Sequence, residues 1–205
     1  GYLVHDSESK LTASIDSPAL DPIEEALRQN GWVLTHIFNT HHHYDHTGAN
    51  LELKKRWKCK IIGSEKDSDR IPGLDEGVND QEIFSFGNNE VKVFDVSGHT
   101  IGHISFYFPR EEKLFCGDAL FALGCGRIFE GTPAQTWDSL QKLERLPEDT
   151  KVYCAHEYTL ANANFAVTVE PQNKVLLDRV QEIKNLRNEG KPTIPSTIGL
   201  EKSTN

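Results

Sequence analysis

The chain has 205 residues, enough to bury a real core as one domain or one domain with a small appendage. Its 22 basic and 31 acidic residues give a net charge of −9, with no basic stretch long enough to follow a nucleic-acid backbone. It contains no apolar run that could span a bilayer and no charged-then-apolar leader, and its four widely spaced cysteines include no CxxC pair. These features predict an acidic cytoplasmic protein with reduced thiols that binds neither nucleic acid nor membrane.

The first part of the chain alternates short strands with helices. Apolar residues around a polar turn predict paired strands at Tyr2–Val4 and Thr12–Ile15. Asp21-Pro22 predicts the start of a helix, and Asn30-Gly31 predicts its end. The pattern then predicts a strand, a helix, a strand and a polar loop, in this order: Thr35–Asn39, Asn50–Lys58, Cys59–Gly63 and Ser64–Asp80.

The second part begins with strands and ends with helices. Gly87-Asn88-Asn89 predicts a hairpin turn between its flanking apolar runs. The expected strands are Glu82–Phe86, Val91–Val96, His103–Phe108, Leu114–Cys116 and Val152–Cys154. The expected helices run from about Thr136 to Leu146, from about Thr159 to Val169, and from Lys174 to Asn188. This order predicts mixed sheets covered by helices on their outer faces, which is an α+β fold.

The segment THHHYDH, Thr40 to His46, places four possible metal ligands within six residues. Such a cluster would be costly to bury unless a cation compensated it. His41 and His43 lie two residues apart, so an extended backbone would turn both rings to one side, where they can share an ion. Asp45 repeats this spacing, and His46 faces elsewhere, toward a second ion. The spacing therefore predicts two metal ions.

The ligand types restrict the kind of metal. Imidazole and carboxylate suit zinc, iron or manganese, and the absence of thiolate from the segment disfavours a structural zinc site. The alternatives are a histidine-rich surface loop without metal and an expression tag. The interleaved Asp45 argues against the first, and the internal position argues against the second.

Three further possible ligands follow expected strands. His99 lies in SGHTIGH, Asp118 follows LFCG, and His156 follows VYCA. Each residue alone would be an ordinary capping or turn residue. Together with the THHHYDH segment they supply the seven groups that two ions need when one carboxylate is shared. We expect His42 to point away from the metals, and His103 to be a supporting or structural residue.

HxHxDH followed by separated His, Asp and His resembles the metallo-β-lactamase superfamily, and Asp16 in SIDS stands where that superfamily has an early Asp. The strings GDALF, GCGRIFEGT, LPEDTKVYCAHEYT and NxxFA are similar to those of the glyoxalase II (hydroxyacylglutathione hydrolase) family. The resemblance covers nearly the whole chain, and these combined strings are highly specific.

The resemblance implies an αββα sandwich with a binuclear metal site between its sheets. It implies that His41, His43 and His99 bind one ion. It implies that Asp45, His46 and His156 bind the other, and that Asp118 bridges both. It also implies that Asp45 and Asp118 orient a metal-bridging hydroxide. We expect Asp16 to hydrogen-bond a metal ligand or to anchor a loop.

The resemblance further implies hydrolysis of S-D-lactoylglutathione to D-lactate and glutathione, a step of methylglyoxal detoxification. Two divalent ions, zinc in the first place and otherwise iron or manganese, would lower the pKa of the attacking water from ~15.7 to about 7. The family's glutathione-binding positions correspond to Arg127, Phe129 and Tyr158 here. Phe129 replaces the usual Tyr and lacks its hydroxyl group, so one hydrogen bond to the substrate is not available.

The chain contains no Met, even at position 1, so we expect a fragment that is truncated at both ends. Residues 1–157 are then a metallo-β-lactamase-like catalytic domain without its first strand. Residues 158–205 are part of a C-terminal helical substrate-binding region, and its incompleteness would raise KM. We expect a monomer, and a mitochondrial form stays open because a leader could precede Gly1.

Two alternative functions remain open. The first is a mononuclear-iron persulfide dioxygenase of the same superfamily, which shares the strings GDAL (starting here at Gly117) and GCGR (starting at Gly124). That family has HDY where this chain has HEYT. A metal-binding fragment with weak substrate binding is the second alternative, although a non-catalytic remnant would be expected to have lost ligands, and none is missing here.

Overall fold

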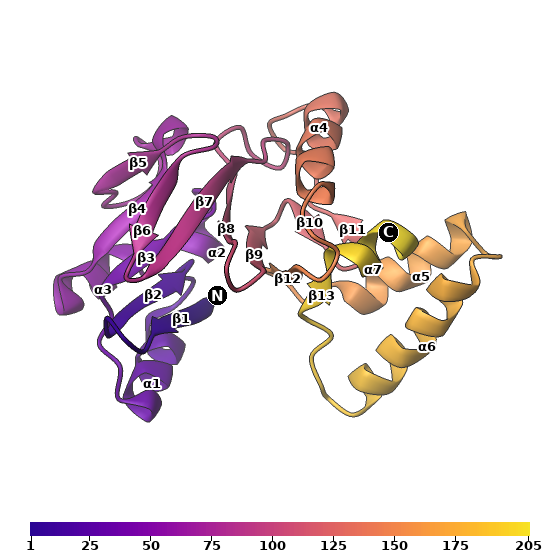
Figure 1. The fold of residues 1–205 in the computed structure, drawn as a ribbon, viewed down its shortest axis with the longest axis horizontal. Coiled ribbons are helices and arrows are strands. Elements are labelled where there is room, and N and C mark those ends of the chain that lie inside the picture. Colours follow the sequence, from indigo (N-terminus) through magenta and orange to yellow (C-terminus); the bar gives the residue numbers. More distant parts are fainter.

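Two mixed sheets packed face to face form the centre of the protein (Figure 1). The structure is a computed structural model that describes residues 1–205. The first sheet has the strand order β1-β2-β3-β4-β5. Its first pair is antiparallel and the remaining pairs are parallel. The strands are β1 (Tyr2–Asp6), β2 (Leu11–Ile15), β3 (His36–Phe38), β4 (Lys60–Ser64) and β5 (Glu76–Val78).

The second sheet has the strand order β13-β12-β9-β8-β7-β6. Its strands are β6 (Ile83–Phe86), β7 (Asn89–Asp95), β8 (Ile104–Phe108), β9 (Lys113–Gly117), β12 (Lys151–Cys154) and β13 (Ser196–Thr197). Only β9 and β12 run parallel to each other. Because they are parallel neighbours, their carboxyl ends meet at one edge, where the chain then leaves both strands.

Alternating side chains explain why each sheet is covered on both faces. On β3, Phe38 lies in the core between the sheets and its neighbour Ile37 packs on the opposite face. On β8, Phe106 points inward and Tyr107 points outward. Successive residues of a strand point to opposite faces, so strands that are apolar throughout must be buried on both sides.

Helices cover the two outer faces, as the αββα prediction requires. The helices α1 (Leu20–Asn30) and α3 (Asn50–Trp57) contribute Leu27 and Leu53 to the core behind the first sheet. The helices α4 (Pro133–Glu144) and α7 (Ile198–Thr204) contribute Leu143 and Ile198 to the core behind the second. The predicted α+β fold class and helix-covered sheets are therefore confirmed.

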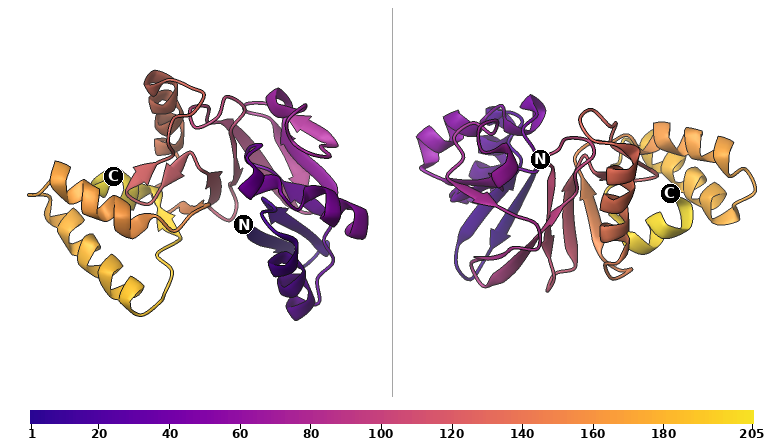
Figure 2. Two further views of the ribbon diagram at one scale, coloured as in Figure 1. Left: turned by 180° about the vertical axis from the view of Figure 1, so that it is seen from behind. Right: turned by 90° about the horizontal axis from the view of Figure 1, so that it is seen from above.

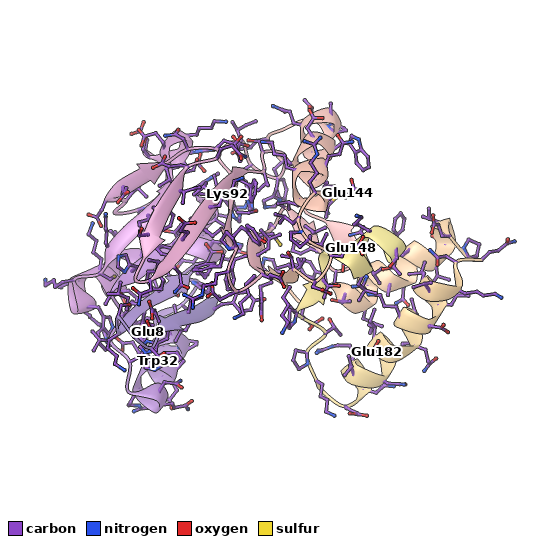
Figure 3. All side chains as sticks on the ribbon, in the orientation of Figure 1. Glu8, Trp32, Lys92, Glu144, Glu148 and Glu182 are labelled. Atoms are coloured by element: carbon purple, nitrogen blue, oxygen red, sulfur yellow. The ribbon has the colours of Figure 1, made fainter.

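The remaining helices, α5 (Thr159–Val169) and α6 (Lys174–Asn188), form an antiparallel pair at the end of the molecule opposite the first sheet (Figure 2). Their apolar side chains pack around Leu123, which follows strand β10. Figure 3 shows the same separation, with Glu182 on α6 far from Glu8 and Trp32. The C-terminal helices therefore contact the sandwich close to the loops at the carboxyl ends of β9 and β12.

Several predicted boundaries were wrong. Ser64–Asp80 is not entirely a loop, because it contains the 3-10 turn η1 (Glu65–Asp67) and strand β5. Helix α4 starts at Pro133, not Thr136, since Thr132 and Gln135 form a reciprocal capping box. Five further short elements were not predicted: α2 (Tyr44–Thr47), β10 (Leu120–Phe121), β11 (Gly124–Cys125), β13 and α7. Strands of two residues carry too little periodicity to be recognised.

All four cysteines are free, and Cys125 is the exposed one among them. Burial raises the pKa of the Cys59 and Cys154 thiols to about 11. These thiols are therefore protonated near neutral pH and serve as small apolar core residues. No helix has both the length and the apolar composition needed to cross a membrane.

Candidate metal centre

The seven expected ligands all lie at one edge of the sandwich, just beyond the ends of strands. His41 and His43 follow β3, and His99 follows β7. Asp118 follows β9, and His156 follows β12. The remaining two ligands, Asp45 and His46, lie on the short helix α2. The extended spacing expected through Asp45 was therefore wrong, because the backbone becomes helical at Tyr44.

The first group consists of three histidines. His41 Nε2 lies 3.0 Å from His43 Nδ1, and His99 Nε2 lies 3.2 Å from the same nitrogen. One ring nitrogen of each residue is thus turned toward a common point. The shared orientation of His41 and His43 agrees with their spacing of two in the sequence.

The second group joins one carboxylate and two imidazoles. Asp45 Oδ2 lies 3.6 Å from His46 Nε2 and 3.4 Å from His156 Nε2. Asp118 lies between the two groups: its Oδ1 is 3.4 Å from His46 Nε2, and its Oδ2 is 3.4 Å from His156 Nε2. Asp118 Oδ2 is also 3.5 Å from His99 Nε2 in the first group. The geometry therefore allows Asp118 to serve both groups.

These distances suit donors that surround metal ions. With metal–nitrogen distances of about 2.0–2.1 Å, tetrahedral ligands lie roughly 3.4 Å apart. In addition, His46 Nε2 and Asp118 Oδ1 are buried and have no hydrogen-bond partner in the protein. Buried polar atoms are almost always satisfied, so these two atoms call for a further partner. Divalent metal binding satisfies them and matches the donor types.

Local electrostatics favours neutral imidazoles at His41 and His43. Burial, together with the neighbouring histidines, lowers the pKa of His41 well below its usual range, and burial lowers that of His43. Burial opposes ionisation of Asp118, but the His156 and His46 rings outweigh it and keep its pKa low. Neutral imidazole and ionised carboxylate are the protonation states that ligate a cation.

Asp16 supports the ligands from beneath. Its Oδ2 lies 2.7 Å from His46 Nδ1 and also accepts a hydrogen bond from the Thr40 hydroxyl group. Its Oδ1 accepts from the Thr40 backbone N–H at 2.8 Å. Asp16 has φ = 58°, an uncommon left-handed conformation for a residue with a side chain. The carboxylate therefore fixes the ring orientation of His46 and the start of the THHHYDH segment.

The two other nearby histidines lie outside the donor groups. His42 points away, and its Nδ1 lies 3.1 Å from Asp67 Oδ2. His103 is fully buried and stacks on His41 with ring centroids 4.6 Å apart, and its Nε2 accepts the Asp118 N–H. Burial lowers the pKa of His103 to about 3, so the ring is neutral. His103 is a packing partner that supports both His41 and Asp118.

A cleft of about 710 Å³ opens over the donor groups and contains the expected substrate-binding residues. Phe129 lies edge-on to His99 at 5.2 Å, while Tyr158 stacks on His156 at 5.0 Å. The Arg127 guanidinium lies 5.8 Å from the Phe129 ring centre. Both aromatic rings are more than half exposed, and Asp45 is the most exposed of the donors. The cleft thus leads from solvent directly to the donor oxygens and nitrogens.

Three further residues line this cleft and were not predicted as site residues: Phe121, Cys125 and Asn162. Asn162 donates a hydrogen bond to the Ala122 carbonyl at 3.0 Å, which ties α5 to the β10–β11 turn. Phe121 packs edge-on against Tyr158. They lay inside the quoted strings GDALF, GCGRIFEGT and NxxFA, but nothing in those strings indicated which side chains would face the cleft.

Comparison with protein families matches two consecutive regions of the chain. Residues 11–156 match the model of the metallo-β-lactamase superfamily. Residues 157–205 match the model of the hydroxyacylglutathione hydrolase C-terminus. All seven donor residues lie within the first region.

Curated relatives match along the full chain. The hydroxyacylglutathione hydrolase of Rhizobium etli is 54% identical over 205 residues, which are 100% of this chain and 80% of the relative. That of Methylococcus capsulatus is 51% identical over 204 residues, again covering 80% of the relative.

Solved structures show the same fold at lower identity. ETHE1 from Myxococcus xanthus is 32% identical with a TM-score of 0.69, covering 77% of this chain and 70% of that chain. TTHA1623, solved in a di-iron-bound form, is 22% identical with a TM-score of 0.71, covering 100% of this chain and 92% of that chain. With both family models and the curated relatives, the chain belongs to the metallo-β-lactamase superfamily and, within it, to the hydroxyacylglutathione hydrolase family.

Proposed function

We propose that this protein is a metal-dependent thioester hydrolase that cleaves S-D-lactoylglutathione to D-lactate and glutathione. The observation that carries the proposal is the arrangement of two donor groups around Asp118 on the floor of an open cleft. The curated relatives at 50–54% identity carry the name of this activity. The substrate is a small-molecule glutathione thioester, and the physiological role is methylglyoxal detoxification.

The proposed cofactors are two divalent ions per chain, with zinc as the first candidate and iron or manganese as others. One ion would be held by His41, His43 and His99, and the other by Asp45, His46 and His156. Asp118 would contact both. Bound there, the ions supply a water of lowered pKa and a Lewis acid for the thioester carbonyl group.

The protein's own groups then control geometry and protons. Asp45 and Asp118 are placed to accept hydrogen bonds from the attacking water and so orient it toward the carbonyl carbon. Because Asp45 is the exposed donor, it is also placed to take up the water proton and exchange it with solvent. The thiolate of glutathione is a good leaving group, so no protein nucleophile is required.

The walls of the cleft are suited to the rest of the substrate. Arg127 offers paired donors to a carboxylate of glutathione. Phe129 supplies an apolar wall without a hydroxyl group, and Tyr158 supplies a ring and a hydroxyl group on the other side. Residues 1–157 then act as the catalytic region, and residues 158–205 as part of the substrate-binding region.

The persulfide dioxygenase alternative is not favoured, because the relatives at 50–54% identity are hydroxyacylglutathione hydrolases along the whole chain. A mononuclear site would also use only part of the donor set. We propose that the protein acts as a monomer in the cytoplasm, the compartment suggested by its reduced thiols.

The decisive experiment combines metal analysis with an assay of thiol release from S-D-lactoylglutathione. Two ions per chain and rapid thiol release are the expected result. One iron per chain, with oxygen uptake in the presence of glutathione persulfide, would instead establish the dioxygenase. Two ions without thiol release would leave a metal-binding protein and overturn the proposed activity.

A further inference from the structure

A group of charged side chains lies directly behind the first donor group and has no role in the mechanism above. Asp67 of η1 is fully buried, and Arg70 and Glu130 partly cover it. Arg70 donates from Nε to Asp67 Oδ1 at 3.1 Å, and from its two terminal nitrogens to the two Glu130 oxygens at 2.6 and 3.2 Å. Such paired contacts fix orientation as well as charge. We refer to Asp67, Arg70 and Glu130 as the ion-pair network.

The network contacts the THHHYDH segment between its first two ligands. Asp67 Oδ2 lies 3.1 Å from Nδ1 of His42, the residue between His41 and His43. The His42 ring also lies 3.8 Å from Glu130 Oε1. Since His42 is held from behind, the neighbouring ligands are kept turned to the opposite side of the backbone.

The same network contacts the turn that carries His99. Glu130 Oε2 accepts the Ile101 backbone N–H at 2.8 Å. The carboxylate of Asp67 presses against Gly102 so closely that a Cβ atom there would lie 2.0 Å from Oδ1. The backbone at residues 101 and 102 therefore packs against Glu130 and Asp67, and glycine is required at position 102 for that contact.

The third segment attached to the network is the cleft wall. Glu130 follows Phe129 directly, and the Phe129 N–H donates to the His99 carbonyl at 3.2 Å. His99 Nδ1 in turn lies 2.7 Å from the Arg127 carbonyl oxygen. Fixing Glu130 thus fixes the ring of Phe129 over His43 and His99.

We propose that Asp67, Arg70 and Glu130 are positioning residues that hold the first donor group and the Phe129 wall in one arrangement. The inference rests on the proposed function of the site. It adds that the two donor groups are supported differently. The network contacts His42, which lies between His41 and His43, and it bonds to Ile101 in the turn after His99. No hydrogen bond or ion pair joins it to Asp45, His46 or His156. Weakening the network should therefore affect the two metal sites unequally.

The test uses the variants Arg70→Ala and Glu130→Ala, with Arg70→Lys as the conservative change. Arg56→Ala is the matched control, because Arg56 pairs with Glu24 at 2.9 Å on the outer side of the first sheet. Metal-free protein is titrated with zinc in competition with a chromophoric chelator. Supporting residues of metal ligands typically contribute about tenfold to a hundredfold in affinity.

In Arg70→Ala we expect one zinc equivalent to bind at least about tenfold more weakly, with the other unchanged. Arg70→Lys should restore only part of the loss, since lysine cannot make the paired contact with Glu130. At saturating zinc, KM for the thioester should rise several-fold with little change in kcat, which indicates lost substrate binding. Glu130→Ala should also speed hydrogen exchange of the Ile101 amide in the metal-free protein, a readout independent of hydrolysis.

Equal weakening of both zinc equivalents, or an effect no larger than that of Arg56→Ala, would overturn the positioning role. Failure of the unaltered protein to hydrolyse the thioester would instead overturn the proposed function. The zinc titration and the Ile101 exchange of the variants separate these two results, because neither depends on turnover.

Discussion

The metal-centre cluster and a second cluster of buried polar side chains differ in the source of their compensating charge. The metal-centre cluster brings histidines and carboxylates together and leaves His46 Nε2 and Asp118 Oδ1 without a protein partner. The second cluster lies between α6 and α7, where Arg179 donates to Glu201 at 2.5 Å and to Ser196 at 2.9 Å. The first cluster needs a ligand from outside, whereas the second is complete within the chain.

The second cluster also has a structural task near the first. Glu201 Oε2 accepts the Leu123 backbone N–H at 2.9 Å, and Arg179 also donates to Thr204. Leu123 lies in the turn between β10 and β11, and that hairpin forms part of the cleft wall. A closed ion pair therefore holds the C-terminal helices on the sandwich, while an open set of donors provides the chemistry. Buried charge can thus serve stability or function, depending on whether the chain itself supplies every partner.

The largest expected effect comes from breaking the open cluster at its shared member. Asp118→Asn keeps the size of the side chain but removes the charge that both donor groups contact. We expect kcat for thiol release to fall by about a thousandfold or more, as when a main electrostatic group of an active site is lost. The measurement is steady-state kinetics with metal analysis of the same sample.

A matched control for that variant is Asp138→Asn, which changes an exposed carboxylate on α4. The control should retain activity and metal content. If Asp118→Asn kept both its metal and its rate, Asp118 would not be the shared ligand.

Breaking the closed cluster should reduce stability with little effect on metal binding. Arg179→Met leaves Glu201 buried without its charge partner, which typically costs about 3–5 kcal/mol of unfolding free energy. For a chain of this size the melting temperature should fall by roughly 6–20 °C. Thermal unfolding of the metal-free protein measures the change.

The double variant Arg179→Met with Glu201→Gln is the control for that loss. Because the unpaired charge is then removed as well, we expect recovery of a large part of the stability. If Arg179→Met lost less than about 1 kcal/mol of unfolding free energy, water would reach the ion pair, and the cluster would not be closed.

Removing the metal should lower the melting temperature through the metal-centre cluster and not through the Arg179–Glu201 cluster. Ligands that bind only the folded state add about 2.7 kcal/mol when present at about 100 times their dissociation constant. A chelator should therefore lower the melting temperature by roughly 5–10 °C. Arg179→Met should keep this metal-dependent shift, while Asp118→Asn should lose most of it. Equal shifts in both variants would contradict the assignment of the open cluster as the metal site.

The smallest effect concerns a single carboxylate that is satisfied by backbone groups. Asp6 accepts the N–H groups of Asn88 and Glu8 at 2.9 Å each. These hydrogen bonds lower the pKa of Asp6 from 3.8 to about 2. A lowered folded-state pKa stabilises the protein above the unfolded value, and the contribution is lost as the pH falls from about 4 to about 2. In Asp6→Asn, the midpoint of urea unfolding should depend less on pH between about 4 and about 2 than it does in the unaltered protein. An unchanged pH dependence of the midpoint would show that Asp6 is not the group responsible.

The local sequence predicted the strands and most helices because their signals are local. Alternating or continuous apolar runs, Asp21-Pro22 and Asn30-Gly31 specify elements without reference to distant residues. The short elements escaped prediction for the opposite reason. Strand β13 exists because Ser196 and Thr197 pair with β12, and strand β5 exists because Glu76–Val78 pairs with β4. Pairing of that kind depends on where the rest of the chain lies.

By itself, the sequence determined which residues could hold metal and, through the family strings, what reaction to expect. The sequence indicated THHHYDH, His99, Asp118 and His156 as ligands, because histidine and aspartate rarely follow several strands of one protein unless they form a metal site. Only the tertiary structure decided that Asp45 and His46 reach the site from a helical turn, and that Asp118 stands between the groups. Only it joined Asp67, Arg70 and Glu130 behind the first donor group. Ligand chemistry belongs to single residues, whereas distances between segments far apart in the chain are set by how the two sheets pack.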